Sequence, residues 1–269
     1  MEETNMKIAV ITGASSGLGC EFINEVISQV SKVSELDEIW LVARREQRLL
    51  ELKEKYDGVC AEKGLQTIIR PVAADITKRS FFEELTAMYK EHDADVRMLI
   101  NNAGCGVLGN LDEMPYEGQI NMVELNNVAL TGITSVTLPF MSKGSNIINV
   151  CSIASFAPNP RMTVYCSTKA YVLSFSKSLR FELRKKGINV LAVCPGPMST
   201  EFLSVAGIQK GASKTFDTLP RTEPSMAARG AVKAVLKGKG IYTPRLFFKF
   251  YRVLAKLLPH SIVMHMSKT

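Results

Sequence analysis

The sequence has little of what would build a metal site or a membrane span. Its 269 residues include only three histidines and six cysteines, and no two cysteines form a CxxC pair. Because this spacing does not suit zinc, we expect no metal site, and we interpret the cysteines as small apolar residues of a reducing compartment. No stretch reaches about 18 uninterrupted apolar residues, so we expect no membrane-spanning helix.

A secretion signal and a nucleic-acid-binding pattern are also missing. Residues 1–7 are acidic and lead into a short apolar run, without the basic and apolar regions of a signal peptide, so we expect a cytoplasmic protein. The formal charge of +7 comes from basic residues spread along the chain and suits an anionic ligand. Nucleic-acid binding would need a basic patch with interleaved aromatic residues, and the sequence has none.

The chain does have an alternation of short apolar runs and longer amphipathic segments. Seven runs predict strands, at residues 7–11, 38–43, 67–73, 97–100, 146–151, 189–193 and 241–243. Their nearly continuous apolar character is typical of parallel strands with helices on both faces. We therefore predict an α/β fold, a single-domain Rossmann-like doubly wound sheet of about seven mainly parallel strands.

The segments between the strands have the length and pattern of helices. Four helices are predicted, at residues 45–56, 80–91, 121–141 and 163–186. Gly187 follows the last of these as its expected C-cap. The sequence has no internal repeat, low-complexity tract or linker, so residues 1–269 are predicted to form one domain.

Three glycines after the first strand predict a dinucleotide site. They stand where the backbone must turn sharply and approach a pyrophosphate closely, and the helix that follows would direct its N-terminal N–H groups at the phosphates. A glycine-rich turn alone is weak evidence, and the later motifs strengthen it. The predicted cofactor contacts in this segment are Gly13, Ser15, Ser16, Gly17, Leu18 and Gly19.

Two arginines after the second strand favour NADP(H) over NAD(H). An acidic residue at this point would bind the adenosine ribose hydroxyls of NAD. The chain instead has Arg44 and Arg45, and a guanidinium group matches the 2′-phosphate of NADP. The alternative is that both arginines begin a solvated helix.

Residues after the third and fourth strands would complete the cofactor site. Asp75 is placed to bind the adenine amino group, with Ile76 beside it, or else to cap the next helix. Asn102, Ala103 and Gly104 would lie beside the cofactor ribose. The asparagines of this segment could equally serve as turn formers.

Ser152, Tyr165 and Lys169 carry the predicted chemistry. Lys169 follows Tyr165 by four residues, so both side chains share one face of a helix. A phenol has an ordinary pKa of about 10. We expect the ammonium group and the positive nicotinamide of the oxidised cofactor to lower the pKa of Tyr165. Tyr165 would then exchange a proton with an alcohol or carbonyl substrate, while the Ser152 hydroxyl holds the substrate oxygen.

With these motifs in order, residues 7–200 resemble the short-chain dehydrogenase/reductase family. The resemblance implies hydride transfer with a nicotinamide cofactor, a lysine that also binds the nicotinamide ribose, and a homo-oligomer whose size the sequence does not fix. It rests on residues 12–19, Asp75, residues 101–104, Ser152, Tyr165 with Lys169, and Pro195 with Gly196.

The resemblance also implies further site residues. Asn126 matches the family's fourth catalytic residue, which holds a water in a relay through the lysine; Asn127 is the alternative, and either could instead bond the backbone of the neighbouring strand. Pro195 and Gly196 would turn beneath the nicotinamide, and Thr200 would bind its carboxamide, unless the Pro-Gly pair only ends a strand.

Substrate recognition is assigned to residues 201–221, where the motifs end. This segment mixes Phe202, Leu203, Val205 and Ile208 with glycines and lysines, and we interpret it as a lid over the substrate. Its apolar residues favour a hydrophobic alcohol or ketone, such as a steroid, a lipid-like carbonyl or a xenobiotic. They could equally be packing residues.

The C-terminal extension, residues 244–269, has the pattern of an amphipathic helix. Arg245, Lys249, Arg252 and Lys256 recur at spacings of four, three and four and form one basic stripe. The helix could make peripheral contact with an anionic membrane. It could also pack on its own domain, flank the substrate mouth or join a dimer.

These observations predict an NADP(H)-dependent oxidoreductase that interconverts a secondary alcohol and a ketone or aldehyde. Two other functions remain: an NADP(H)-sensing binding protein without turnover, and a membrane-surface interaction protein that acts through its basic tail. The intact Ser152, Tyr165 and Lys169 favour the enzyme, since a binding protein needs no proton-transfer group.

Overall fold

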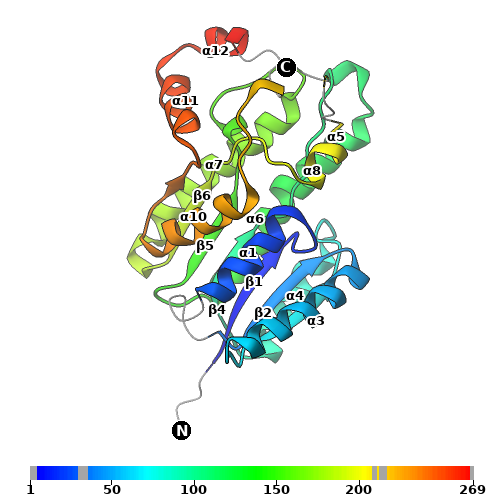
Figure 1. Ribbon diagram of the computed structural model, residues 1–269, viewed down its shortest axis with the longest axis vertical. Helices are drawn as coiled ribbons and strands as arrows, with labels where there is room; N and C mark the ends of the chain where they lie inside the picture. Colours follow the sequence, from blue (N-terminus) through cyan, green and yellow to red (C-terminus); the bar gives the residue numbers. More distant parts are fainter. Residues whose placement is uncertain (1–4, 30–35, 208–210, 212–216, 267–269) are drawn as a thin grey trace.

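The computed structural model describes residues 5–29, 36–207, 211 and 217–266. All strands in this part of the chain are parallel and form one sheet in the order β3-β2-β1-β4-β5-β6-β7 (Figure 1). They are β1 (Met6–Thr12), β2 (Glu38–Ala43), β3 (Ile68–Ala73), β4 (Ala94–Asn101), β5 (Asn146–Val150), β6 (Asn189–Val193) and β7 (Ile241–Tyr242). The predicted seven-stranded α/β fold is confirmed.

Helices cover both faces of the sheet, because alternate residues of each strand point to opposite sides. In β1, Ala9 and Ile11 belong to one apolar core, whereas Ile8 and Val10 belong to the other. The first core is closed by α1 (Gly17–Ser28), α3 (Glu46–Glu62) and α10 (Pro224–Leu236). The second is closed by α4 (Ser80–Glu91), α6 (Leu130–Thr137) and α7 (Thr163–Leu183).

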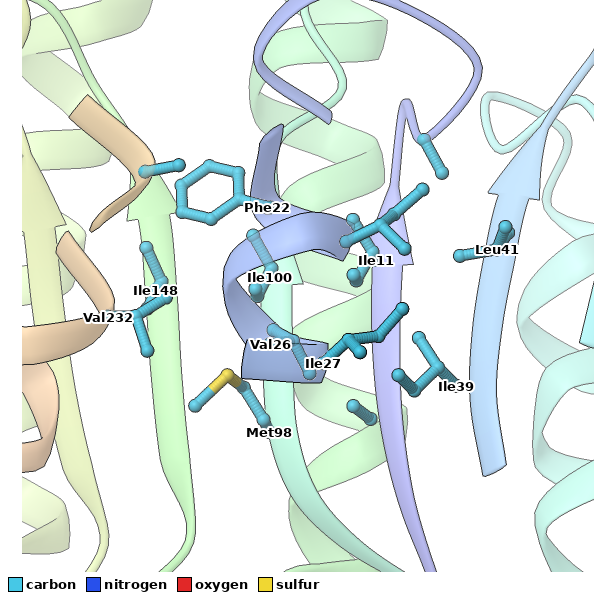
Figure 2. Packing of buried hydrophobic residues seen from close by; sticks show 14 of the residues in the cluster. Ile11, Phe22, Val26, Ile27, Ile39, Leu41, Met98, Ile100, Ile148 and Val232 are labelled. Atoms are coloured by element: carbon cyan, nitrogen blue, oxygen red, sulfur yellow. The ribbon is translucent and has the colours of Figure 1, made fainter. Parts of the chain in front are cut away.

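Figure 2 shows how the first core anchors α1. Phe22, Val26 and Ile27 of α1 pack on the middle of the sheet, close to Ile11 of β1 and Ile100 of β4. All five side chains are almost completely buried. Since burying one such side chain contributes about 1.5–3 kcal/mol, this packing fixes the position of the N-terminus of α1, which begins inside the glycine motif at Gly17.

The helix predicted at residues 121–141 is interrupted. α5 (Tyr116–Val123) runs into a π-helical turn, η2 (Glu124–Ala129), which leads to α6 and a short 3₁₀ turn, η3 (Leu138–Phe140). In η2, the buried Asn127 amide donates to the carbonyl oxygen of Thr168 on α7 at 2.9 Å. Single π turns are frequent at functional sites.

The helix predicted at residues 163–186 is confirmed in its position. It consists of α7 and a final 3₁₀ turn, η5 (Arg184–Lys186). Gly187 ends it with a φ of +70°, the left-handed conformation expected of a glycine C-cap.

Buried asparagines join the sheet to α6 and α7 just before the strands end. Asn101 of β4 lies opposite Asn149 of β5, and the Asn101 amide donates to the Asn149 side-chain oxygen at 2.9 Å. Asn101 also donates to the Thr134 hydroxyl of α6, and Asn149 donates to the Ser176 hydroxyl of α7. Buried polar groups that are paired in this way fix neighbouring elements in one arrangement.

Three further helices lie toward the carboxyl ends of the strands. They are α8 (Glu201–Val205), α11 (Leu246–Leu257) and α12 (His260–Met266). Figure 1 shows α11 and α12 at the end of the molecule opposite the N-terminus. Among the described residues, no helix combines the length and apolar character needed to cross a membrane.

Candidate active site

A cavity of about 990 Å³ lies at the carboxyl ends of the strands. Open α/β sheets bind ligands at this edge, where the strand order reverses, here between β1 and β4. Gly19 and Asn126 of the predicted site do not line the cavity. The predicted residues that do line it are Gly13, Ser15, Ser16, Gly17, Leu18, Arg44, Arg45, Asp75, Ile76, Asn102, Ala103, Gly104, Ser152, Tyr165, Lys169, Pro195, Gly196 and Thr200.

The glycine motif brings the backbone close to the N-terminus of α1. Gly13 has a φ of +64°, a left-handed conformation that strains other residues. A Cβ atom on Gly19 would lie 2.2 Å from the carbonyl oxygen of Gly13, so no side chain fits there. The first turn of α1 contains no acidic residue. Its unbonded N–H groups and the positive end of the helix dipole therefore suit the phosphates of a dinucleotide.

Thr12 and Asn102 hold the glycine loop against the end of β4. The Thr12 hydroxyl accepts hydrogen bonds from the backbone N–H groups of Asn102 and Ala103, at 3.0 and 3.1 Å. The Asn102 amide donates to the carbonyl oxygens of Thr12 and Gly13, at 3.0 and 3.1 Å. The Asn102 side chain thus holds the glycine loop instead of forming a turn in its own segment, and its place beside the cofactor ribose stays a prediction. These hydrogen bonds of Thr12 were not predicted; the available signal was its place at the end of β1, directly before Gly13.

Arg44 and Arg45 both reach the cavity but have different neighbours. Arg45 donates to the Ser15 hydroxyl at 3.1 Å and to the Ser15 carbonyl oxygen at 3.2 Å, and it pairs with Glu201 at 3.1 Å. Arg44 is exposed. α3 begins at Glu46, so both arginines precede the helix. The Arg45 guanidinium therefore lies next to the turn that would hold a pyrophosphate, and Arg44 lines the same cavity.

Asp75 stabilises a turn after β3. Its Oδ1 accepts hydrogen bonds from the Thr77 hydroxyl at 2.8 Å and from the Thr77 N–H at 3.1 Å. The hydroxyl bond lowers the pKa of Asp75, and the charge of Arg44 also lowers it. The alternative that Asp75 caps the next helix is wrong, because Arg79 occupies the N-cap of α4. The contacts of Asp75 and Ile76 with adenine stay predictions.

Ser152, Tyr165 and Lys169 meet in the wall of the cavity. The Ser152 hydroxyl accepts a hydrogen bond from the Ala154 N–H at 3.1 Å and is also hydrogen-bonded to the Tyr165 phenol. The Lys169 ammonium nitrogen lies 5.8 Å from the centre of the Tyr165 ring. It donates to the Val150 carbonyl oxygen at 2.9 Å. α7 and the end of β5 thus bring together the three residues that were predicted to act together.

Burial controls the acid–base behaviour of these side chains. It raises the pKa of Tyr165, and the hydrogen bond with Ser152 offsets part of this rise. It also lowers the pKa of Lys169. In the polypeptide alone the pKa of Tyr165 is therefore raised, because burial removes the phenolate from water. The expected lowering of this pKa by the ammonium group together with the positive nicotinamide of the oxidised cofactor stays a prediction. The protonated phenol is the form that can donate a proton to a carbonyl oxygen.

Asn126, which lies in η2, is held by three hydrogen bonds to residues outside this turn. Its side-chain oxygen accepts from the Cys105 N–H at 2.9 Å, and its amide donates to the Cys105 carbonyl oxygen at 2.9 Å and to the Thr168 hydroxyl at 3.0 Å. A Cβ atom on Gly104 would lie 3.0 Å from the Asn126 oxygen and 3.4 Å from the Lys169 ammonium nitrogen, so both groups flank Gly104. Asn126 thus bonds the backbone of the loop after β4 and a hydroxyl of α7, not the backbone of a neighbouring strand, and its part in a water relay stays a prediction.

Apolar side chains from several segments line another part of the cavity. From α8 come Phe202, whose ring lies 5.8 Å from the ring of Tyr165, and Leu203. The predicted lid is only partly described, and Ile208 lies outside the described residues. The C-terminal extension supplies apolar wall residues that sequence reasoning did not assign: Phe247, Phe248, Phe250, Tyr251, Leu254 and Val263.

α11 is attached to the cofactor side of the cavity through one aromatic ring. Phe248 is completely buried, and a Cβ atom on Gly196 would lie 2.1 Å from its ring. Gly196 therefore leaves space that the Phe248 ring fills. Tyr251 packs beside Phe156, with the ring centres 6.3 Å apart. This face of the helix packs on its own domain and borders the mouth of the cavity.

Comparisons with known proteins agree with this geometry. The family described as short chain dehydrogenase matches residues 7–210. An NADP-dependent 3-hydroxy acid dehydrogenase of Schizosaccharomyces pombe is 30% identical over 231 residues, which cover 83% of this chain and 83% of that protein. A short-chain dehydrogenase from Sphingobium yanoikuyae, solved in complex with NADPH, is 28% identical with a TM-score of 0.73, covering 94% of this chain and 96% of that one.

A solved short chain dehydrogenase/reductase from Burkholderia phymatum, in complex with NAD, shares the fold. It has a TM-score of 0.78 at 20% identity and covers 100% of this chain and 98% of that one. The family match extends from β1 past α8, and so includes the glycine motif, Ser152, Tyr165 and Lys169. The chain therefore belongs to the short-chain dehydrogenase/reductase family of oxidoreductases.

Proposed function

We propose that the protein is an NADP(H)-dependent oxidoreductase that interconverts a hydrophobic secondary alcohol and the corresponding ketone or aldehyde. The observation that carries the proposal is the position of Ser152 and Tyr165. They lie in one cavity with the glycine loop and α1 N-terminus on one side and an apolar wall on the other. A cofactor and an apolar substrate bound in these two parts would meet beside the Tyr165 phenol.

The residues of the chain supply the proton and the positioning of the reaction. When bound, NADPH supplies the hydride that adds to the carbonyl carbon. The Ser152 hydroxyl holds the carbonyl oxygen and stabilises the negative charge that develops on it. Tyr165, kept protonated by burial, donates its proton to that oxygen. Lys169 would bind the nicotinamide ribose, as the family resemblance implies.

The preference for NADP(H) rests on Arg44 and Arg45. A guanidinium group can bind a 2′-phosphate through two hydrogen bonds, and the two arginines stand at the end of β2 where NAD-dependent relatives of this fold need an acidic residue. The NADP dependence of the yeast relative and the NADPH complex of the structural neighbour support the same choice. The test is the ratio of kcat/KM for NADPH to that for NADH. We expect a ratio well above one, and a preference for NADH contradicts the assignment.

The apolar wall favours a hydrophobic substrate such as a steroid or a lipid-like carbonyl. We expect NADPH oxidation to be faster with bulky apolar ketones than with small water-soluble ones, because the larger molecules bury more apolar surface against α8 and α11. A spectrophotometric screen against ketones of graded size measures this. Cofactor binding without turnover across the whole series would favour the sensing protein instead.

The proposal also includes the compartment and the assembly. All six cysteines are free, which suits the reducing cytoplasm.

Large apolar side chains of α5, η2 and α7 are exposed, among them Tyr116, Ile120, Val128 and Tyr171. Their burial against a second copy of the chain would support a homo-oligomer. Light scattering coupled to size-exclusion chromatography gives the mass in solution, and a monomer at micromolar concentration would contradict this part.

A further inference from the structure

α11 has an apolar face that the described part of the chain leaves uncovered. Leu246, Phe250, Val253 and Leu257 recur at spacings of four, three and four residues, and so lie along one side of the helix. Their exposed fractions are 80%, 68%, 51% and 74%. A contiguous row of large exposed apolar side chains indicates an interaction surface, whereas scattered ones do not. We call these four residues the apolar row.

A row of basic residues runs beside the apolar row. Arg245, Lys249, Arg252 and Lys256 each directly precede one of its members. Arg245, Lys249 and Lys256 are exposed. The expectation that the positive charge is spread along the chain is wrong for the net charge: residues 224–269 contain nine Lys and Arg and no Asp or Glu, whereas residues 1–223 contain 24 basic and 26 acidic residues. An apolar face flanked by cations is the pattern by which helices lie on anionic lipid.

The apolar row is continuous with the mouth of the cavity. Phe250 of the row and the neighbouring Phe247 both line the cavity. Ile262 of α12 is also an exposed apolar residue, at 47%. In Figure 1 α11 and α12 form an outer end of the molecule, where a flat surface could reach them. A surface that covered the apolar row would therefore also lie against the mouth of the cavity.

We propose that α11 docks the protein on an anionic membrane surface, with the apolar row in the lipid interface and the basic row against the headgroups. A second copy of the chain fits this surface less well, because pairing two such helices would bring two basic rows together without any acidic residue of the same segment to offset them. The docking needs no catalytic activity. Docking in this orientation would let an apolar substrate enter the cavity from the lipid, and this consequence rests on the proposed function.

The test is flotation of the full-length protein with vesicles of phosphatidylcholine, alone or with phosphatidylglycerol. We expect binding to the anionic vesicles and at least tenfold weaker binding to the neutral ones. Leu246→Ser with Leu257→Ser should weaken anionic binding at least tenfold, as should Lys249→Glu with Lys256→Glu. Neither pair lines the cavity. The matched controls, Leu111→Ser with Phe181→Ser and Lys90→Glu with Lys177→Glu, remove exposed residues elsewhere and should leave binding unchanged.

Several outcomes overturn the proposal. The first is that the wild-type protein does not bind anionic vesicles. The second is that both α11 variants still bind them. The third is that only the charge variant loses binding, which would mean that the attraction is electrostatic and not specific to the apolar row. A change of the mass in solution caused by the serine variant, with no vesicle binding, assigns the apolar row to a second copy. Turnover of a water-soluble ketone is measured separately without lipid, so failure of the docking and failure of the proposed reaction are distinguishable.

Discussion

The two sides of the cavity differ in how they are built. The cofactor side is built on the ends of β1, β4 and β6, and its contacts, such as the hydrogen bond from the Asn102 amide to the Gly13 carbonyl oxygen, join segments that the sheet already holds together. The substrate side consists mainly of apolar side chains from α8 and α11. Besides packing, α8 is held by the Arg45–Glu201 ion pair and α11 by a hydrogen bond from Arg252 to the Thr243 hydroxyl. The first side is thus fixed largely by hydrogen bonds to the main chain of the sheet, and the second largely by the packing of side chains.

The largest effect is expected where the two sides meet. Tyr165→Phe removes the proton donor but keeps the ring, so turnover should fall by about 10³-fold, while the Kd for NADPH changes little. Steady-state NADPH oxidation and calorimetric titration measure the two quantities. Tyr171→Phe, on the same helix with its hydroxyl bonded to Thr131, is the control and should leave turnover unchanged. Activity retained by the Tyr165 variant removes the proposed donor.

Two glycine substitutions test whether backbone geometry fixes the cofactor side. Gly19→Ala places a methyl group against the Gly13 carbonyl oxygen, so we expect the loop to move and NADPH affinity to fall by about 100-fold. Gly58→Ala, in α3 with open space around the new carbon, should instead raise stability by about 0.5–1 kcal/mol and leave affinity unchanged. Equal affinities of both variants would contradict the close approach at Gly19.

On the substrate side, two phenylalanines of α11 test how the helix is attached. Phe248→Ala empties the space above Gly196 and should lower the free energy of unfolding by about 3–5 kcal/mol or release the helix from the domain. Phe250→Ala changes an exposed residue and should cost no more than about 0.5 kcal/mol. Urea unfolding measures both, and KM for an apolar ketone should rise with the first variant. Similar losses of stability in the two variants would contradict the described packing.

The smallest effect concerns pH. Because burial raises the pKa of Tyr165, the phenol stays protonated at and beyond its ordinary pKa of about 10. Ketone reduction needs the protonated form, so kcat/KM for the ketone with NADPH should be flat from about pH 6 to 9 and fall only in more alkaline solution. A decline between about pH 7 and 8 would mean that another group, or a lowered Tyr165 pKa, controls the rate.

The sequence predicted the fold well, and it predicted which residues meet at the carboxyl ends of the strands, because these signals are local. A strand is recognised within its own apolar run, and the four-residue spacing of Tyr165 and Lys169 places them on one helix face whatever surrounds them. The family resemblance then related Ser152 to this pair. The seven strands were therefore predicted close to their observed bounds.

The parts that sequence reasoning missed depend on contacts between distant segments. The π turn η2 is held by bonds from Asn126 to Cys105 and Thr168, which no helical pattern in residues 121–141 reveals. The packing of Phe248 on Gly196 joins residues 52 positions apart. The direction of the Tyr165 pKa depends on burial, and burial is a property of the assembled structure.

The packing of Phe248 on Gly196 links the C-terminal extension to the turn after β6. Because Gly196 leaves no room for a side chain beneath the ring, a change at either position has to be matched by a change at the other. Exposed residues of α11, such as Leu246 and Leu257, are under no such constraint. Sequence changes should therefore accumulate faster on the outer face of α11 than at the pair formed by Gly196 and Phe248.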